Sequence, residues 1–161
     1  PISNIYKHIS SPENKINVFD VAQFFVNKDK TINKTKIQKL LYYAQGYYLA
    51  RYNKVLFQDA IEAWPYGPII SSVYAETLKQ EFQKQYYFDF SSQMTNSPFT
   101  EEQKAILEQV FDDFGNLSDK QLSKKTYNEF PWKTTYDPHK LYSKCIIKPS
   151  ILSRFFKIKK D

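Results

Sequence analysis

The chain has 161 residues, of which 42% are hydrophobic and 17% aromatic, so it can form the core of one domain and is too apolar for wholesale disorder. The single cysteine, Cys145, excludes an internal disulfide framework and is typical of a reducing compartment. No run of about 18 apolar residues and no signal-peptide pattern occurs. We therefore expect a soluble, cytoplasmic protein without a membrane partner.

The net charge of +6 is spread unevenly along the chain. Residues 1–54 carry a net charge of +6, residues 55–147 carry −4, and residues 148–161 carry +4. Such asymmetry is typical of a protein with a nucleic-acid, membrane or acidic-protein partner, or of a surface on which lysines only maintain solubility. Arg51 and Arg154 are the only arginines, whereas base recognition relies on arginine, so the pattern favours solvation over specific nucleic-acid binding.

The N-terminal part predicts a lead-in and a first helix. Residues 1–16 have mixed polarity with Pro1, Pro12 and a Ser-Ser step, which indicates a loosely held lead-in. Asn17 can cap a helix that runs to about Asn27, because apolar residues follow it at spacings of three and four.

The strongest predicted helix begins at Thr31 or Asn33 and ends near Tyr52. Its apolar stripe consists of Ile37, Leu40, Leu41, Ala44, Tyr47 and Tyr48. Lys34, Lys36 and Lys39 are expected on the solvated side, where they are also candidates for docking an acidic partner. Gly46 costs about 1 kcal/mol relative to Ala inside a helix, which indicates that another backbone or a bulky ring approaches there.

The next stretch predicts a small hairpin and a rigid corner. The segments 55–57 and 60–64 can pair around Gln58 and Asp59. The corner then follows as Trp-Pro-Tyr-Gly-Pro from Trp64 to Pro68. Two prolines fix its backbone, and Gly67 can adopt a positive φ. Pro68 suits the first turn of a helix that runs to about Gln83.

The C-terminal half predicts three helices and a second corner. Residues 86–99 lack periodicity and are predicted to form a loop. Two capping boxes, Thr100 with Gln103 and Ser118 with Gln121, open a helix ending at Gly115 and a shorter one through Leu122. Phe130-Pro131-Trp132 is a second aromatic and proline corner, Pro149 opens the last helix, and residues 157–161 form a basic tail. Together these elements predict a mainly α, compact single-domain helical bundle with a short β-hairpin beside the first corner.

The sequence contains few residues that could carry catalysis. No metal-binding motif or phosphate-binding glycine loop occurs, so we expect no metal, no cofactor and no catalytic residue. Cys145 with His139 is a conceivable nucleophile and base, but a lone cysteine is more often a small buried hydrophobe. Glu62 lies near Trp64 in the predicted hairpin. Glutamate is seldom buried, so an outward side chain is favoured over an inward one that would need a cation or donors. Trp64, Tyr66 and Pro68 in the corner are either core residues or a contact surface for a partner.

Several motifs together resemble one known family. They are KIQKLLYYAQGYYLA from Lys36 to Ala50, IEAWPYGPIISSVY from Ile61 to Tyr74, and LSKKTYNEFPW from Leu122 to Trp132. This combination resembles the Panacea domain, also called the SocA-like antitoxin domain, which is common on phages and mobile elements. The resemblance covers residues 17–156. The residues that carry it or support the expected fold include Leu40, Tyr43, Gly46, Glu62, Gly67 and Trp132. Relatives commonly have His at the position of Tyr127, which puts any role of that histidine in question here.

The resemblance implies a non-enzymatic antitoxin that neutralises a cognate toxin by direct binding. In some relatives the domain is a proteolytic adaptor that delivers the toxin to an AAA+ protease. Three alternatives remain open: a nucleic-acid-binding protein that uses the basic N-terminal third and the tail, an enzyme with an unrecognised site, and a phage-encoded inhibitor of a host protein. The candidate partner contacts are Trp64, Tyr66, Pro68, Lys34, Lys36 and Lys39.

Overall fold

A computed structural model describes residues 16–160 of the chain. The first fifteen residues of the predicted lead-in and residue 161 of the predicted tail lie outside the described residues. The elements in chain order are α2 (Val18–Lys28), α3 (Lys34–Tyr52), β1 (Glu62–Trp64), β2 (Gly67–Ile69), α4 (Ser71–Phe82), α5 (Glu101–Phe114), α6 (Asp119–Tyr127), α7 (Phe130–Thr135), η2 (Tyr142–Lys144) and α8 (Pro149–Lys160). The predicted fold class is confirmed, because the described part is mainly helical with one small antiparallel sheet.

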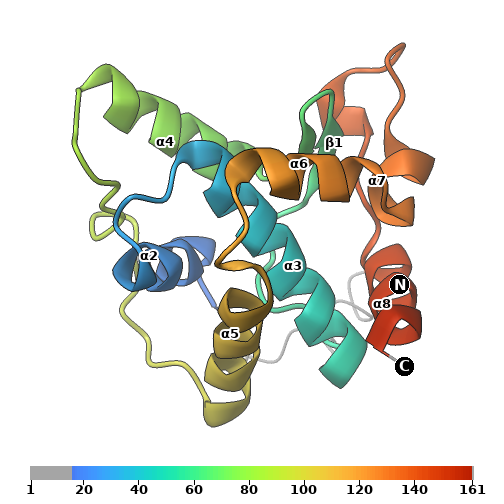
Figure 1. Ribbon diagram of the computed structural model, residues 1–161, viewed down its shortest axis with the longest axis horizontal. Helices are drawn as coiled ribbons and strands as arrows, with labels where there is room; N and C mark the ends of the chain where they lie inside the picture. The colour runs from blue at the N-terminus through green and yellow to red at the C-terminus, as the bar shows by residue number, and fades with distance from the viewer. Residues whose placement is uncertain (1–15, 161) are drawn as a thin grey trace, which may run out of the picture.

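Helix α3 is the centre of the fold, and α2, α4, α5, α6 and α8 all pack on it (Figure 1). The Asn33 side chain caps its start by accepting from the Lys36 N–H, and Asn53 ends it in a left-handed conformation. Because neighbours surround α3, its middle is buried on almost every side. The sequence predicted burial of a single apolar stripe with a solvated opposite side, whereas the buried surface of α3 is much wider than that stripe.

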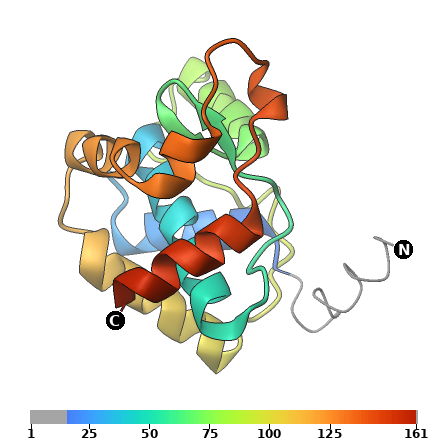
Figure 2. The ribbon, with the colours of Figure 1, turned by 90° about the vertical axis from the view of Figure 1, so that its right-hand side faces the viewer.

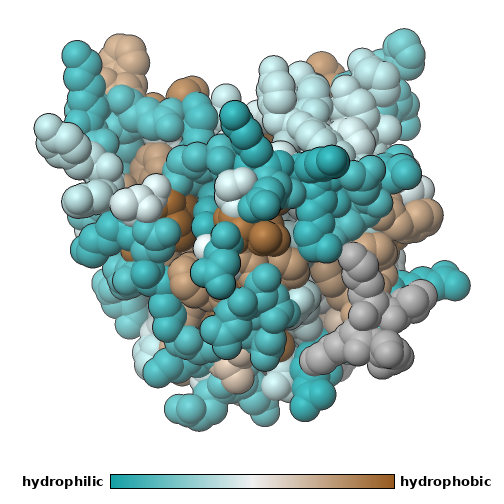
Figure 3. All heavy atoms as spheres, viewed as in Figure 1, coloured by the Kyte–Doolittle hydropathy of each residue, from teal (hydrophilic) through white to brown (hydrophobic). Residues whose placement is uncertain are grey.

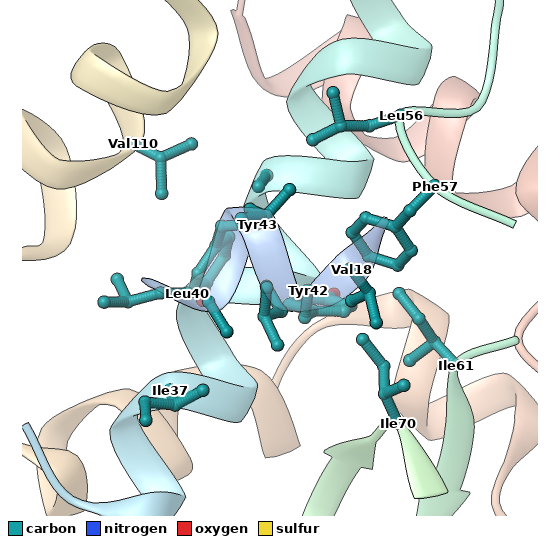
Figure 4. Close-up of a cluster of buried hydrophobic side chains, with 14 of the residues drawn as sticks. Val18, Ile37, Leu40, Tyr42, Tyr43, Leu56, Phe57, Ile61, Ile70 and Val110 are labelled. Carbon is teal, nitrogen blue, oxygen red and sulfur yellow. The ribbon is translucent and has the colours of Figure 1, made fainter. Parts of the chain in front are cut away.

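The hydrophobic core gathers around the middle of α3 (Figure 4). Leu40, Tyr42 and Tyr43 of this helix are fully buried and meet side chains from α2, α5 and the chain near the hairpin. Each fully buried Leu contributes about 1.5–3 kcal/mol relative to an exposed one. The core thus fixes α3 relative to the elements that form the surface around it.

Helices α3 and α8 cross (Figure 2). Gly46 of α3 lies at their contact, against Phe156 of α8. A Cβ built at this position would overlap the ring of Phe156, which α8 places directly against the α3 backbone. The prediction that Gly46 admits a close neighbour is therefore confirmed, and the neighbour is an aromatic ring.

The hairpin forms one segment later than predicted. β1 pairs with β2 in antiparallel register, with Trp64 opposite Gly67, so the corner itself is the turn. Gly67 has a φ of 110°, which confirms the expected positive φ. Pro68 lies in β2 opposite Ala63, and α4 begins only at Ser71, so the predicted helix start at Pro68 was wrong.

Two buried glutamines of α3 explain these differences. The Gln38 side chain accepts from the Ile70 N–H at 2.8 Å and donates to the Ile70 carbonyl at 3.1 Å, which holds that residue extended. The Gln45 side chain makes the same kind of pair with the Leu56 N–H at 2.7 Å and the Phe57 carbonyl at 2.8 Å. The segment 55–57 is therefore bound to a helix side chain and does not form the predicted hairpin with residues 60–64.

The remaining elements agree with the sequence in most respects. Both capping boxes are present, and residues 86–99 contain no helix or strand. Helix α6 continues to Tyr127, beyond the predicted end near Leu122. The second predicted corner is instead the first turn of α7, where Pro131 needs no backbone donor.

Candidate functional site

A groove of about 620 Å³ lies beside the corner, between the first half of α3, the hairpin, α4 and α6. The residues that line it are Lys34, Thr35, Gln38, Lys39, Trp64, Tyr66, Ile69, Tyr74, Asp119, Lys120, Ser123, Lys124 and Tyr127. We call this feature the corner groove. Its lining combines four lysines and several aromatic rings with one carboxylate, that of Asp119. The face that carries α6 is largely hydrophilic, with small apolar patches (Figure 3).

The structure separates the three corner residues that were predicted as partner contacts. Tyr66 is 70% exposed and projects from the turn. Trp64 is half-buried, and Pro68 is buried inside β2. Only Tyr66 therefore exposes most of its ring to solvent, whereas Pro68 is enclosed and restricts the backbone.

Trp64 and Trp132 join the second and third of the three motifs. The indole N–H of Trp132 donates to the Trp64 carbonyl at 2.8 Å, and the indole N–H of Trp64 donates to a Glu62 carboxylate oxygen at 2.7 Å. The Trp64 ring also packs on Tyr74 and Tyr142, with centroid distances of 4.9 and 5.0 Å. Glu62 is half-buried, so its carboxylate is partnered by an indole and is not a free charge at the rim.

Tyr127 is the residue for which the family resemblance implied a histidine, and it lines the corner groove. Its ring meets Trp132 edge-on at 4.9 Å, and Trp132 stacks on Tyr136 at 4.8 Å. Burial, aided by the neighbouring Tyr66 and Tyr136, raises the pKa of Tyr127. In this chain the position therefore supplies a neutral aromatic wall of the corner groove.

The three lysines predicted on one wet face occupy three different environments. Lys34 forms a surface ion pair with Glu81 at 2.9 Å. The Lys36 ammonium donates to the Gly115 carbonyl at 2.6 Å, at the C-terminal end of α5. Lys39 is fully buried, which corrects the prediction that it is solvated. Its position on α3 faces the hairpin, which the sequence pattern of α3 alone did not reveal.

Lys39 holds the corner from its buried side, through a hydrogen bond to the backbone. Its ammonium donates to the Tyr66 carbonyl at 3.0 Å, and a Cβ at Gly67 would come within 2.9 Å of the Lys39 Nζ. None of the ion pairs formed by the described residues includes Lys39. Burial without a carboxylate partner lowers the pKa of Lys39 to about 8.

Replacing Lys39 by Met is expected to leave the protein as stable as the wild type at pH 7 or more stable. Met fills a similar volume, removes the desolvation cost of a buried charge, and loses one hydrogen bond worth about 1 kcal/mol. The folded-state pKa of about 8 lies below the ordinary 10.5, so the unfolded chain binds more protons between these values. Wild-type stability should therefore gain up to about 3 kcal/mol from Lys39 as pH rises through this window.

Urea unfolding of both proteins from pH 7 to pH 10 checks this expectation. The stability of the Lys39→Met variant relative to the wild type should decrease steadily as pH rises. The tyrosines titrate in both proteins, so the comparison isolates Lys39. A difference that stays constant across the range would show that Lys39 titrates normally.

Glu129 is a buried polar centre whose burial and contacts the sequence did not predict. Its carboxylate oxygens Oε1 and Oε2 accept from the hydroxyls of Tyr42 and Tyr43, respectively, both at 3.0 Å, and Oε2 also lies 3.4 Å from the Lys125 ammonium. Burial, reinforced by the Glu129 charge, raises the pKa of both tyrosines, so they remain protonated donors. The only sequence signal was the place of Glu129 inside the third family motif.

A second pocket of about 590 Å³ opens beside this centre. Tyr43, Tyr47, Phe114 and Phe156 form its aromatic part, and Asp113 accepts from the Tyr47 hydroxyl at 2.6 Å. The carboxylates here are satisfied by tyrosines, a lysine and the amide of Gln109, which is typical of a structural network.

The other candidates for chemistry do not converge. Cys145 is buried, and its thiol lies 3.9 Å from the Asp137 carbonyl. His139 is exposed. Within residues 16–160, no three His, Cys, Asp or Glu side chains are grouped so that they could hold a metal ion. None of the helices in the same part of the chain has the length and apolar character needed to cross a membrane.

Comparison with protein families identifies the domain. A family model described as "Antitoxin SocA-like, Panacea domain" matches residues 37–133, which include the corner, most of the corner groove and Glu129. The chain belongs to this family. No curated protein and no solved structure matches the chain. Helices α2 and α8 lie outside the matched segment, yet both pack on α3. The core of this Panacea-domain protein therefore includes residues on both sides of the matched segment as well as residues within it.

Proposed function

We propose that this Panacea-domain protein is an antitoxin that neutralises a toxin protein by direct, non-catalytic binding. Membership of the SocA-like antitoxin family is the observation that carries this proposal. The exposed Tyr66 on a preformed turn supports it, because binding sites commonly centre on aromatic side chains held by a rigid scaffold.

The corner is built to keep one shape before binding. Pro65 and Pro68 restrict the backbone on both sides of Tyr66, and Lys39 holds its carbonyl from below. Trp132 anchors the first strand through the Trp64 carbonyl. A surface that is already ordered loses less conformational entropy on association, so more of the contact energy appears as affinity. The antitoxin then acts by covering the active or target-binding face of the toxin.

Co-expression with the protein encoded by the adjacent open reading frame tests this function. We expect that protein alone to stop growth, and we expect the antitoxin to restore growth and to co-purify with it. The Tyr66→Ala variant should weaken the complex about tenfold or more, which corresponds to at least about 1.4 kcal/mol. The matched control is Tyr86→Ala, because Tyr86 is 98% exposed and lies outside the corner groove.

The outcomes separate the proposed function from its alternatives. A harmless neighbour that does not co-purify would contradict the proposal. Equal weakening by Tyr66→Ala and Tyr86→Ala would show that the corner is not the contact. A shortened half-life of the bound toxin in cells that contain an AAA+ protease would assign the adaptor role, whereas an unchanged half-life would assign neutralisation by occlusion alone.

A further inference from the structure

We propose that the corner groove binds an acidic segment of the protein partner. This inference rests on the proposed function and adds to it the chemistry of the partner and the place where it binds. The groove holds Lys34 from α3 on one side, and Lys120 and Lys124 from α6 on the other, with Lys39 beneath the corner.

The groove lysines carry more positive charge than the fold neutralises. Lys120 and Lys124 are four residues apart on α6 and therefore share one face of the helix. Both are exposed, and neither takes part in an ion pair formed by the described residues. Lys34 is paired with Glu81 at the surface, where such pairs contribute little.

Lys39 strengthens this field from inside the protein. Its charge is shielded from water and is not balanced by a carboxylate among the described residues, so its potential extends into the groove with little screening. Asp119 is the single acidic side chain in the lining. Carboxylates of a bound segment would therefore relieve the mutual repulsion of these lysines.

The aromatic side chains of the groove would contact the apolar parts of a bound peptide. Trp64, Tyr66 and Tyr127 present ring surface to the groove. Such rings pack against the aliphatic stems of glutamates and against apolar residues between them, while lysines pair with the carboxylates. The combination fits a peptide in which acidic residues alternate with apolar or aromatic ones.

The distribution of charge favours a peptide over a nucleic acid. A nucleic-acid site follows the backbone with a stripe of basic residues, often with arginine. Here the lysines converge on one short groove. No arginine lines the groove.

Fluorescence anisotropy tests the groove with three labelled probes: a peptide of alternating Glu and Tyr, the same peptide with Gln in place of Glu, and oligothymidylate. We expect the Glu peptide to bind more tightly than both others. The Lys120→Gln/Lys124→Gln variant should weaken the Glu peptide about fivefold to tenfold, as expected for two solvent-accessible charge pairs. The matched control is Lys54→Gln/Lys104→Gln, which removes two exposed charges outside the groove and should change affinity less than about twofold.

Each contrary outcome overturns the inference. These outcomes are no binding of the Glu peptide at low salt, equal binding of the Gln peptide, an equal loss in the control variant, or tighter binding of oligothymidylate through the same lysines.

Co-purification then separates the groove inference from the proposed antitoxin function. If the wild type retains the toxin and the groove variant retains it equally, the groove inference fails and the antitoxin function stands. If the wild type binds the Glu peptide through Lys120 and Lys124 but never the toxin, the antitoxin function fails and the groove belongs to another acidic protein.

Discussion

The Glu129→Ala variant is expected to lose about 3–5 kcal/mol of unfolding free energy, which is a large fraction of the stability of a single domain. The substitution leaves the buried hydroxyls of Tyr42 and Tyr43 without their acceptor and leaves Lys125 without its carboxylate. Urea unfolding at pH 7 measures the loss. Because Glu129 ties α3 to the chain between α6 and α7, the same variant should also weaken the wall of the corner groove.

Two controls establish that the loss comes from the buried network. Glu108→Ala removes a carboxylate of a surface ion pair with Lys28 and should cost at most about 1 kcal/mol. The combined variant Tyr42→Phe/Tyr43→Phe/Glu129→Leu removes the donors together with the acceptor and should recover much of the stability. A Glu129→Ala protein within about 1 kcal/mol of the wild type would contradict the role of Glu129 as the acceptor of both tyrosines.

The Gly46→Ala variant is expected to be less stable by about 1–3 kcal/mol, although the same change in an ordinary helix would gain about 1 kcal/mol. The added methyl group would overlap the ring of Phe156. That ring is confined by Tyr42, Tyr43 and Tyr47, whose centroids lie 5.7, 5.9 and 5.7 Å away. The ring therefore has little room to move aside, and α8 must shift away from α3.

A double-mutant cycle with Phe156→Leu checks the cause of this loss. In the Phe156→Leu background, Gly46→Ala should be neutral or stabilising, because the obstructing ring is gone and the helix propensity of Ala remains. Thermal or urea unfolding of the four proteins gives the coupling. An equal penalty in both backgrounds would place the strain elsewhere than at the contact with Phe156.

The sequence alone determined the features that depend on local chemistry. The sequence offered Thr31 or Asn33 as the start of α3, and the structure has Asn33. The pairs Thr100 with Gln103 and Ser118 with Gln121 predicted the starts of α5 and α6, because a helix start needs acceptors for its free N–H groups wherever it lies. Gly67 between two prolines indicated a positive φ, because a tight corner needs that conformation and glycine, without a Cβ, adopts it readily. The joined motifs also indicated the antitoxin family, since they are read directly from residue order.

Only the tertiary structure decided which polar groups are buried and what they bind. Gln38 and Gln45 determine where extended chain replaces helix or hairpin, through bonds that span 32 and 12 residues. Lysine is usually a surface residue, yet Lys39 is buried against the corner because the hairpin folds back over that turn of α3. Glu129 meets Tyr42 and Tyr43 across 87 and 86 residues. Periodicity describes one helix at a time, whereas the burial of these groups depends on partners that reach α3 from distant parts of the chain.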